Sequence, residues 1–204
     1  SVGSRFGHDA YCNADLDGDG AVDIIVSAPF ADSATFDASG AIYVLPTQST
    51  SLEDATFRLQ GLASNAWLGW SFAVGDIDGD KLMDIAAGAP GINSSLGSIY
   101  VWKGSDLQIN QTAPTIEFRS NQTRIGKEVH ISDINHDGLD DLLIGEPKGT
   151  LVSEGSDPNL SNTGLVHIFL GRPDLSVFDG IQTIQEADLR ISIDIEQAYF
   201  GQKI

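Results

Sequence analysis

The chain has 204 residues, 41% of them apolar, and its 29 acidic and 11 basic side chains give a formal charge of −18. The apolar content predicts a globular fold with a sizeable core. The negative charge excludes nucleic acid and anionic membrane surfaces as partners, because both attract basic patches. No apolar run reaches the roughly 18–20 residues of a membrane-spanning helix.

A segment of about sixty residues occurs three times, which is typical of repeat architectures. Each copy contains an acidic stretch that leads at once into an apolar run and a proline. The acidic stretches begin at Asp15, Asp76 and Asp133, and the proline follows 14 residues later in every copy, at Pro29, Pro90 and Pro147.

Each copy also holds four short strand-like runs separated by Gly, Asp, Ser and Pro. The second run is apolar throughout, as in a strand buried on both faces, whereas the fourth alternates, as in a half-exposed strand. This gradient predicts an all-β fold of three complete four-stranded antiparallel propeller blades. The predicted strands are 9–14, 22–28, 40–45 and 56–60; 71–74, 85–89, 98–102 and 116–119; and 128–132, 142–145, 165–170 and 189–193.

The predicted blades cover about residues 5–62, 66–121 and 124–195, and 199–204 opens a further blade. The third copy is lengthened by two polar insertions, 148–163 and 172–187. Propellers close with about four to eight blades. We therefore expect this chain to be part of a larger ring that further blades or another chain complete.

The three acidic stretches are predicted metal-binding loops, with side-chain ligands at positions 1, 3, 5 and 9 and a backbone carbonyl at position 7. Hard oxygen donors without nitrogen or sulfur favour calcium over zinc or copper, so the sequence predicts three Ca²⁺ sites. The predicted ligands are Asp15, Asp17, Asp19, Asp23 and the carbonyl of Ala21; Asp76, Asp78, Asp80, Asp84 and the carbonyl of Leu82; and Asp133, Asn135, Asp137, Asp141 and the carbonyl of Leu139.

Two features of these loops refine the prediction. An EF-hand requires a glutamate at position 12, where this chain has Val26, Ala87 and Ile144, so that motif is excluded. At position 6 the first and third loops have glycine, whereas the second has Lys81. Backbone strain and positive charge at Lys81 predict that the second site is the weakest.

Short motifs flank the loops in every copy: Phe6-Gly7 with Ser27-Ala28-Pro29, Leu68-Gly69 with Gly88-Ala89-Pro90, and Ile125-Gly126 with Gly145-Glu146-Pro147. In these motifs the chain resembles FG-GAP repeats, the family that builds the seven-bladed propeller of integrin α chains and of glycosylphosphatidylinositol-specific phospholipase D. The resemblance implies calcium loops that staple the outer edge of a seven-bladed ring. It departs at Ile125, which replaces an aromatic residue, and at Glu146, which replaces alanine.

Two functions stay open. The first is a calcium-binding extracellular module, secreted or on the cell surface, that is non-catalytic and serves structure, adhesion or the binding of a protein or glycan. The second is the accessory propeller of an enzyme that resembles the phospholipase, whose catalytic residues are implied to lie in a separate domain. The extracellular setting is suggested by four glycosylation sequons, at Asn93, Asn110, Asn121 and Asn159.

No catalytic constellation is apparent, because the four histidines show no ligand spacing. We expect His167, at a strand position, to pack in the interior and His136 to point to solvent. Trp67, Trp70 and Trp102 are expected to pack the blades. The one cysteine, Cys12, is expected to be a buried free thiol.

Overall fold

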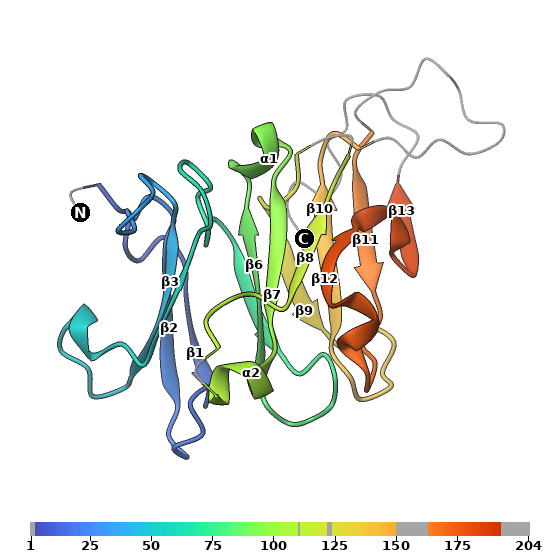
Figure 1. Cartoon of the computed structure of the whole chain (residues 1–204). Helices are drawn as coiled ribbons and strands as arrows, with labels where there is room; N and C mark the ends of the chain where they lie inside the picture. The colour runs from blue at the N-terminus through green and yellow to red at the C-terminus, as the bar shows by residue number, and fades with distance from the viewer. Residues whose placement is uncertain (1–2, 110, 122–123, 150–162, 193–204) are drawn as a thin grey trace, which may run out of the picture.

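The computed structural model describes residues 3–109, 111–121, 124–149 and 163–192. Within these ranges the chain forms three β-sheets, one for each sequence repeat, which stand side by side in chain order (Figure 1). The predicted all-β class is confirmed, since the helical segments are single turns. None of the helices in the described ranges has the length and apolar character to cross a membrane.

The first sheet is a four-stranded antiparallel sheet with its strands in chain order. Its outermost strand alternates, with Phe57 and Leu59 buried and Arg58 exposed, whereas its second and third strands are almost wholly buried. A 3-10 turn, Leu52–Asp54, precedes the last strand. The strands are β1 (Ala10–Ala14), β2 (Asp23–Ala28), β3 (Ala41–Pro46) and β4 (Phe57–Gln60).

The second sheet has the same antiparallel order and a fifth strand at its outer edge. That fifth strand, β12 (Gly180–Thr183), pairs with β8 in parallel and comes from the third repeat. Short helical turns α1 (Ile92–Ser95) and α2 (Gly104–Gln108) flank the third strand. The antiparallel strands are β5 (Phe72–Gly75), β6 (Asp84–Ala89), β7 (Ser98–Trp102) and β8 (Ile116–Arg119).

The third sheet again has four antiparallel strands. They are β9 (Val129–Ser132), β10 (Asp141–Glu146), β11 (Leu165–Phe169) and β13 (Leu189–Ser192). In all three sheets the twelve strands predicted from the sequence are confirmed, with bounds that agree within one residue.

The insertion at 172–187, which we call the strap, is more structured than predicted. It carries a 3-10 turn at Leu175–Phe178, then β12, then a second 3-10 turn at Ile184–Glu186. No strand was predicted in this polar insertion, so β12 is an addition to the twelve predicted strands. Its sequence is too short to signal a strand, and β12 forms because the edge of β8 supplies hydrogen-bonding partners.

Neighbouring sheets pack face to face through two apolar clusters. The first seam, between the first and second sheets, is built around Ile25, Val44, Leu59, Ile85, Tyr100 and Trp102. The second seam, between the second and third sheets, is built around Ile99, Val101, Phe118, Ile131, Leu142 and Phe169. Burial between two sheets explains why the inner strands are apolar on both faces.

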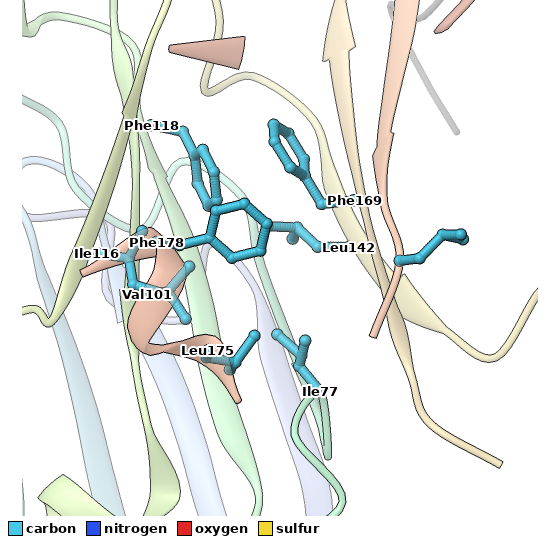
Figure 2. Close-up of a pocket in the computed structure, with 9 residues that line it drawn as sticks. Ile77, Val101, Ile116, Phe118, Leu142, Phe169, Leu175 and Phe178 are labelled. Carbon is cyan, nitrogen blue, oxygen red and sulfur yellow. The ribbon is translucent and has the colours of Figure 1, made fainter. Parts of the chain in front are cut away.

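The strap closes the second seam from the side. Leu175 and Phe178 line a small apolar pocket together with Phe118 and Phe169, and the ring of Phe178 lies between the two sheets (Figure 2). Its ring centroid is 5.9 Å from that of Phe118 and 5.8 Å from that of Phe169. The aromatic cluster thus joins the strap to strands of both sheets.

The tryptophans and the cysteine give mixed outcomes. Trp102 is fully buried and its indole N–H donates to the carbonyl of Thr112 over 2.9 Å, so its predicted packing role is confirmed. Trp67 and Trp70 are half-buried and pack against Phe30. The expectation of a buried Cys12 is wrong, because this residue is exposed on β1, an edge strand of the first sheet.

Candidate metal sites

The three acidic loops occupy equivalent places in the fold. Each connects the first strand of its sheet to the second, and all three lie at the same end of the sheets (Figure 1). Their backbones share one conformation, because positions 4 and 6 have a left-handed φ in every loop. These angles are 77° and 86° at Gly18 and Gly20, 75° and 71° at Gly79 and Lys81, and 62° and 91° at His136 and Gly138.

This conformation points backbone N–H groups at the carboxylate in position 1. Asp15 accepts from the N–H groups of Gly18 (2.7 Å) and Gly20 (2.9 Å). Asp76 accepts from those of Gly79 (2.7 Å) and Lys81 (3.0 Å) in the same way. The loops are therefore wrapped around their first aspartate.

In the third loop the position-1 carboxylate is bound slightly differently. Asp133 accepts from the N–H groups of Asp137 (3.2 Å) and Gly138 (3.0 Å). The loop thus keeps the contact to position 6 but exchanges the contact at position 4 for one at position 5.

The aspartate in position 9 is buried in all three loops. Asp23 is 2% exposed, and Asp84 and Asp141 are fully buried. Each accepts a hydrogen bond from the N–H of position 2 in its own loop, at 2.8, 2.8 and 3.0 Å respectively. These carboxylates hold the base of each loop against its sheet.

Burial also changes the acidity of these groups. It raises the pKa of Asp84 to about 7, with backbone N–H donors opposing the rise and the carboxylates of Asp78 and Asp80 adding to it. Burial likewise raises the pKa of Asp23 and of Asp78. Among the described residues no cationic side chain pairs with these crowded, partly desolvated carboxylates, and a bound cation would supply the positive charge.

Six of the predicted ligands come together in two triads. One oxygen from each of Asp15, Asp17 and Asp19 lies within 4.8 Å of the others, and the same holds for Asp76, Asp78 and Asp84. Calcium–oxygen bonds of about 2.3–2.6 Å place the ligand oxygens of one ion within about 5 Å of each other. The two triads, all oxygen and all anionic, therefore fit a hard divalent cation such as Ca²⁺.

The remaining predicted ligands lie in the same loops but outside these triads. In the described ranges the third loop forms no such carboxylate triad. There Asn135 donates its amide N–H to Asp137 Oδ2 over 2.9 Å. The ligand roles of Asp23, Asp80 and the third loop, and of the carbonyls of Ala21, Leu82 and Leu139, stay predictions.

Some hydrogen bonds to the loops come from residues that are not among the predicted ligands. Thr56 donates its hydroxyl to Asp17 Oδ2 (3.1 Å), and Gly104 and Gly171 donate N–H groups to Asp84 and Asp141, both over 2.8 Å. Asp140 binds the backbone of Asp76. The one signal in the sequence is at position 8, where Asp140 replaces the apolar Val22 and Met83.

The histidines lie away from the triads. His167 is fully buried, and its Nε2 is 2.9 Å from Glu146 Oε2, so packing in the interior is confirmed. Ser120 donates its hydroxyl to the other oxygen of Glu146 over 2.6 Å. The carboxylate thus stands between serine and histidine, whereas a serine nucleophile needs the base beside it. His136 is exposed, as predicted.

Two of the four sequon asparagines are described. Asn93 is half-buried and donates its amide N–H groups to Ser98 Oγ (2.8 Å) and to Glu117 Oε1 (3.4 Å), which occupies the nitrogen that a glycan needs. Asn121 is exposed. Asn110 and Asn159 lie outside the described residues. Glycosylation of these sites stays a prediction.

Comparison with known proteins agrees with this arrangement. The model of the FG-GAP repeat matches residues 12–45 and 68–102, which contain the first and second loops. Integrin alpha-X of Mus musculus is 28% identical over 190 residues, which are 87% of this chain and 16% of the relative. Integrin alpha-4 of Xenopus laevis is 33% identical over 152 residues, 71% of this chain and 14% of the relative.

A second kind of relative is an enzyme. Phosphatidylinositol-glycan-specific phospholipase D of Rattus norvegicus is 28% identical over 204 residues, which are 93% of this chain and 23% of the relative. The chain therefore spans less than a quarter of the length of these relatives. By its repeats and these relatives, the chain belongs to the FG-GAP repeat family and is a distant homologue of integrin alpha chains and of phosphatidylinositol-glycan-specific phospholipase D.

Proposed function

We propose that this chain is a calcium-binding, non-catalytic FG-GAP module of an extracellular protein, with a structural, adhesive or partner-binding role. The observation that carries the proposal is the pair of aspartate triads at equivalent places in two repeats. A catalytic group is not expected to recur with its scaffold in each sheet. A metal site that stabilises a repeat is expected to recur with that repeat.

The metal is proposed to hold each loop closed. Asp15, Asp17 and Asp19 would bind one Ca²⁺, and Asp76, Asp78 and Asp84 a second, with the third loop as a further site. A bound cation cancels the repulsion among carboxylates that the loop brings together. Because the loops join the first two strands of each sheet, closing them would order those strands.

Calorimetric titration of the chain with Ca²⁺ tests this proposal. We expect saturable binding at two or more sites, which D17N and D78N each reduce by one. The same titration with K⁺ serves as the control for ionic strength. Absence of Ca²⁺ binding by the unsubstituted chain would refute the proposal.

We further propose that additional blades, or another chain, pack on the outer faces of this stack. The outer face of the first sheet carries the apolar cluster of Val26, Tyr43 and Leu45, and that of the third exposes Leu189 (52%) and Ile191 (48%). Light scattering that finds a stable, well-folded monomer of this polypeptide would count against this proposal.

An accessory role in a phospholipase-like enzyme is the second candidate. It is favoured by the similarity to phosphatidylinositol-glycan-specific phospholipase D, which extends over 93% of this chain. The two candidates differ in the rest of the polypeptide: an upstream metal-dependent hydrolase domain would favour the enzyme, and a downstream membrane span an adhesion protein.

A further inference from the structure

We infer that Asp140, which belongs to the third loop, is the positioning residue for the second metal site, so that the triad of Asp76, Asp78 and Asp84 depends on the third sheet. In the part of the chain that the structure describes, the backbone of Asp15 in the first loop receives no hydrogen bonds from the second sheet. This inference rests on the proposed function, because it concerns how the proposed second site is kept ready for a cation.

Asp140 makes two hydrogen bonds to the backbone of Asp76, one to its N–H and one to its carbonyl. Its Oδ2 accepts from the N–H of Asp76 over 2.9 Å, and its own N–H donates to the carbonyl of Asp76 over 3.0 Å. Asp76 is position 1 of the second loop, around which that loop is wrapped. A two-point contact of this kind fixes both the place and the orientation of the ligand.

Two glycines of the second repeat leave the space in which the third loop approaches the second loop. A Cβ atom at Gly75 would lie 2.6 Å from Asp140 Oδ2, so the residue before Asp76 must be small. A Cβ at Gly79 would lie 2.5 Å from a methyl group of Leu139. In addition, the backbone N–H of Arg172 donates to the carbonyl of Ile77 over 3.0 Å. The second loop thus rests on the third sheet from residue 75 to residue 79.

The first loop provides the natural comparison. The counterpart of Asp140 in the second repeat is Met83, whose thioether packs with the apolar first seam and is at best a weak acceptor. Within the described residues, the hydrogen bonds of the first loop come from that loop and from Thr56 of the same sheet. Its triad therefore receives no hydrogen bond from the described residues of the second sheet, although the side chain of Gln108 from α2 lies against Gly18.

The pair of hydrogen bonds between Asp140 and the backbone of Asp76, which we call the clasp, also joins the second site to the third loop. Asp140 is the direct neighbour of Asp141, the buried position-9 carboxylate, which itself accepts from Ile134 and Gly171. A cation that orders the third loop would therefore order the clasp and, through it, Asp76. Groups that hydrogen-bond to metal ligands typically contribute about 10–100-fold to metal affinity.

The test measures Ca²⁺ affinity by calorimetry in two backgrounds, D17N, which disables the first site, and D78N, which disables the second. We expect D140A to weaken binding about tenfold in the D17N background and less than about twofold in the D78N background. D140N, whose amide oxygen can still accept from Asp76, should stay within about threefold of the parent. V22A, at the matching exposed position of the first loop, should leave both affinities unchanged.

Equal losses in the two backgrounds would overturn the inference, and so would a loss in D140N as large as that in D140A, since charge and not positioning would then be responsible. Hydrogen exchange in calcium-free buffer separates this result from failure of the proposed function. D140A should speed exchange at residues 76–79 but not at 15–20, and unchanged exchange at 76–79 would overturn the positioning role. Absence of Ca²⁺ binding by the unsubstituted chain would instead overturn the proposed function.

Discussion

The two seams of this molecule join equivalent sheets in different ways. Across the first seam, apolar packing is supplemented by backbone hydrogen bonds at one end, such as that from the N–H of Leu68 to the carbonyl of Ser39 (3.0 Å). The second seam has an apolar cluster as well, but it is also fastened by the Asp140 clasp, the strap and a buried polar bridge. Repetition of the motif thus specifies the sheets, whereas residues that differ between the copies specify how firmly two sheets are joined.

Of the contacts that distinguish the second seam from the first, the buried polar bridge around Glu146 is expected to contribute most to the free energy of unfolding. Glu146 is fully buried and links Ser120, at the end of the second sheet, to His167 in the third. Glu146→Ala would restore the alanine that the other two repeats have, yet it would leave buried polar partners without this carboxylate. We expect a loss of about 3–5 kcal/mol in the free energy of unfolding, measured by urea denaturation. A neutral result would show that the bridge does not fasten the seam.

The strap should contribute almost as much. Phe178 is 9% exposed and packs on Phe118 and Phe169, so Phe178→Ala should lower the free energy of unfolding by about 3 kcal/mol. Val177, its neighbour, is 59% exposed and provides the matched control, with an expected change within about 0.5 kcal/mol for Val177→Ala. Similar effects of the two substitutions would mean that the strap is not anchored through this ring.

Removal of calcium should have a smaller effect per site. A ligand at ten times its dissociation constant stabilises the native state by about 1.4 kcal/mol at each site. We therefore expect EDTA to lower the melting temperature of the chain, and excess Ca²⁺ added to the same buffer to restore it. A melting curve that is identical in both buffers would exclude a stabilising cation.

The smallest effect is expected at position 6 of the second loop. Lys81 has a φ of 71°, a conformation that costs a residue with a Cβ roughly 1 kcal/mol relative to glycine. Lys81→Gly should raise the free energy of unfolding by about that amount and strengthen Ca²⁺ binding at the second triad. The reverse change in the first loop, Gly20→Ala, should lower stability, and thermal denaturation of both variants measures the difference.

Much of the fold could be predicted because its determinants are local. Apolar runs such as Ile85–Ala89 identify the inner strands, and repeated aspartates identify the loops that close into triads. The expectation for Cys12 failed because the repeat pattern gives the place of this residue on its strand but not the exposure of an edge strand.

The features of the second seam could not be predicted because they depend on distant partners. Asp140 and Asp76 are 64 positions apart, and the aspartate at position 8 of the third loop marks Asp140 as unusual without identifying its partner. In the same way β12 has only four residues, and its pairing partner β8 lies in another repeat. Backbone strain was predicted at Lys81 alone, whereas His136, which replaces a glycine of the other loops, also has a left-handed φ of 62°.

The pairing of β12 with β8 has a consequence for the order in which the chain folds. Ile181 lies opposite Glu117, so the outer strand of the second sheet stays an open edge until more than sixty further residues have been synthesised. An open edge can pair with other chains, and contacts between distant residues form late. During synthesis the first sheet can be completed as its residues emerge, whereas the second remains unfinished until the third repeat returns to cover it.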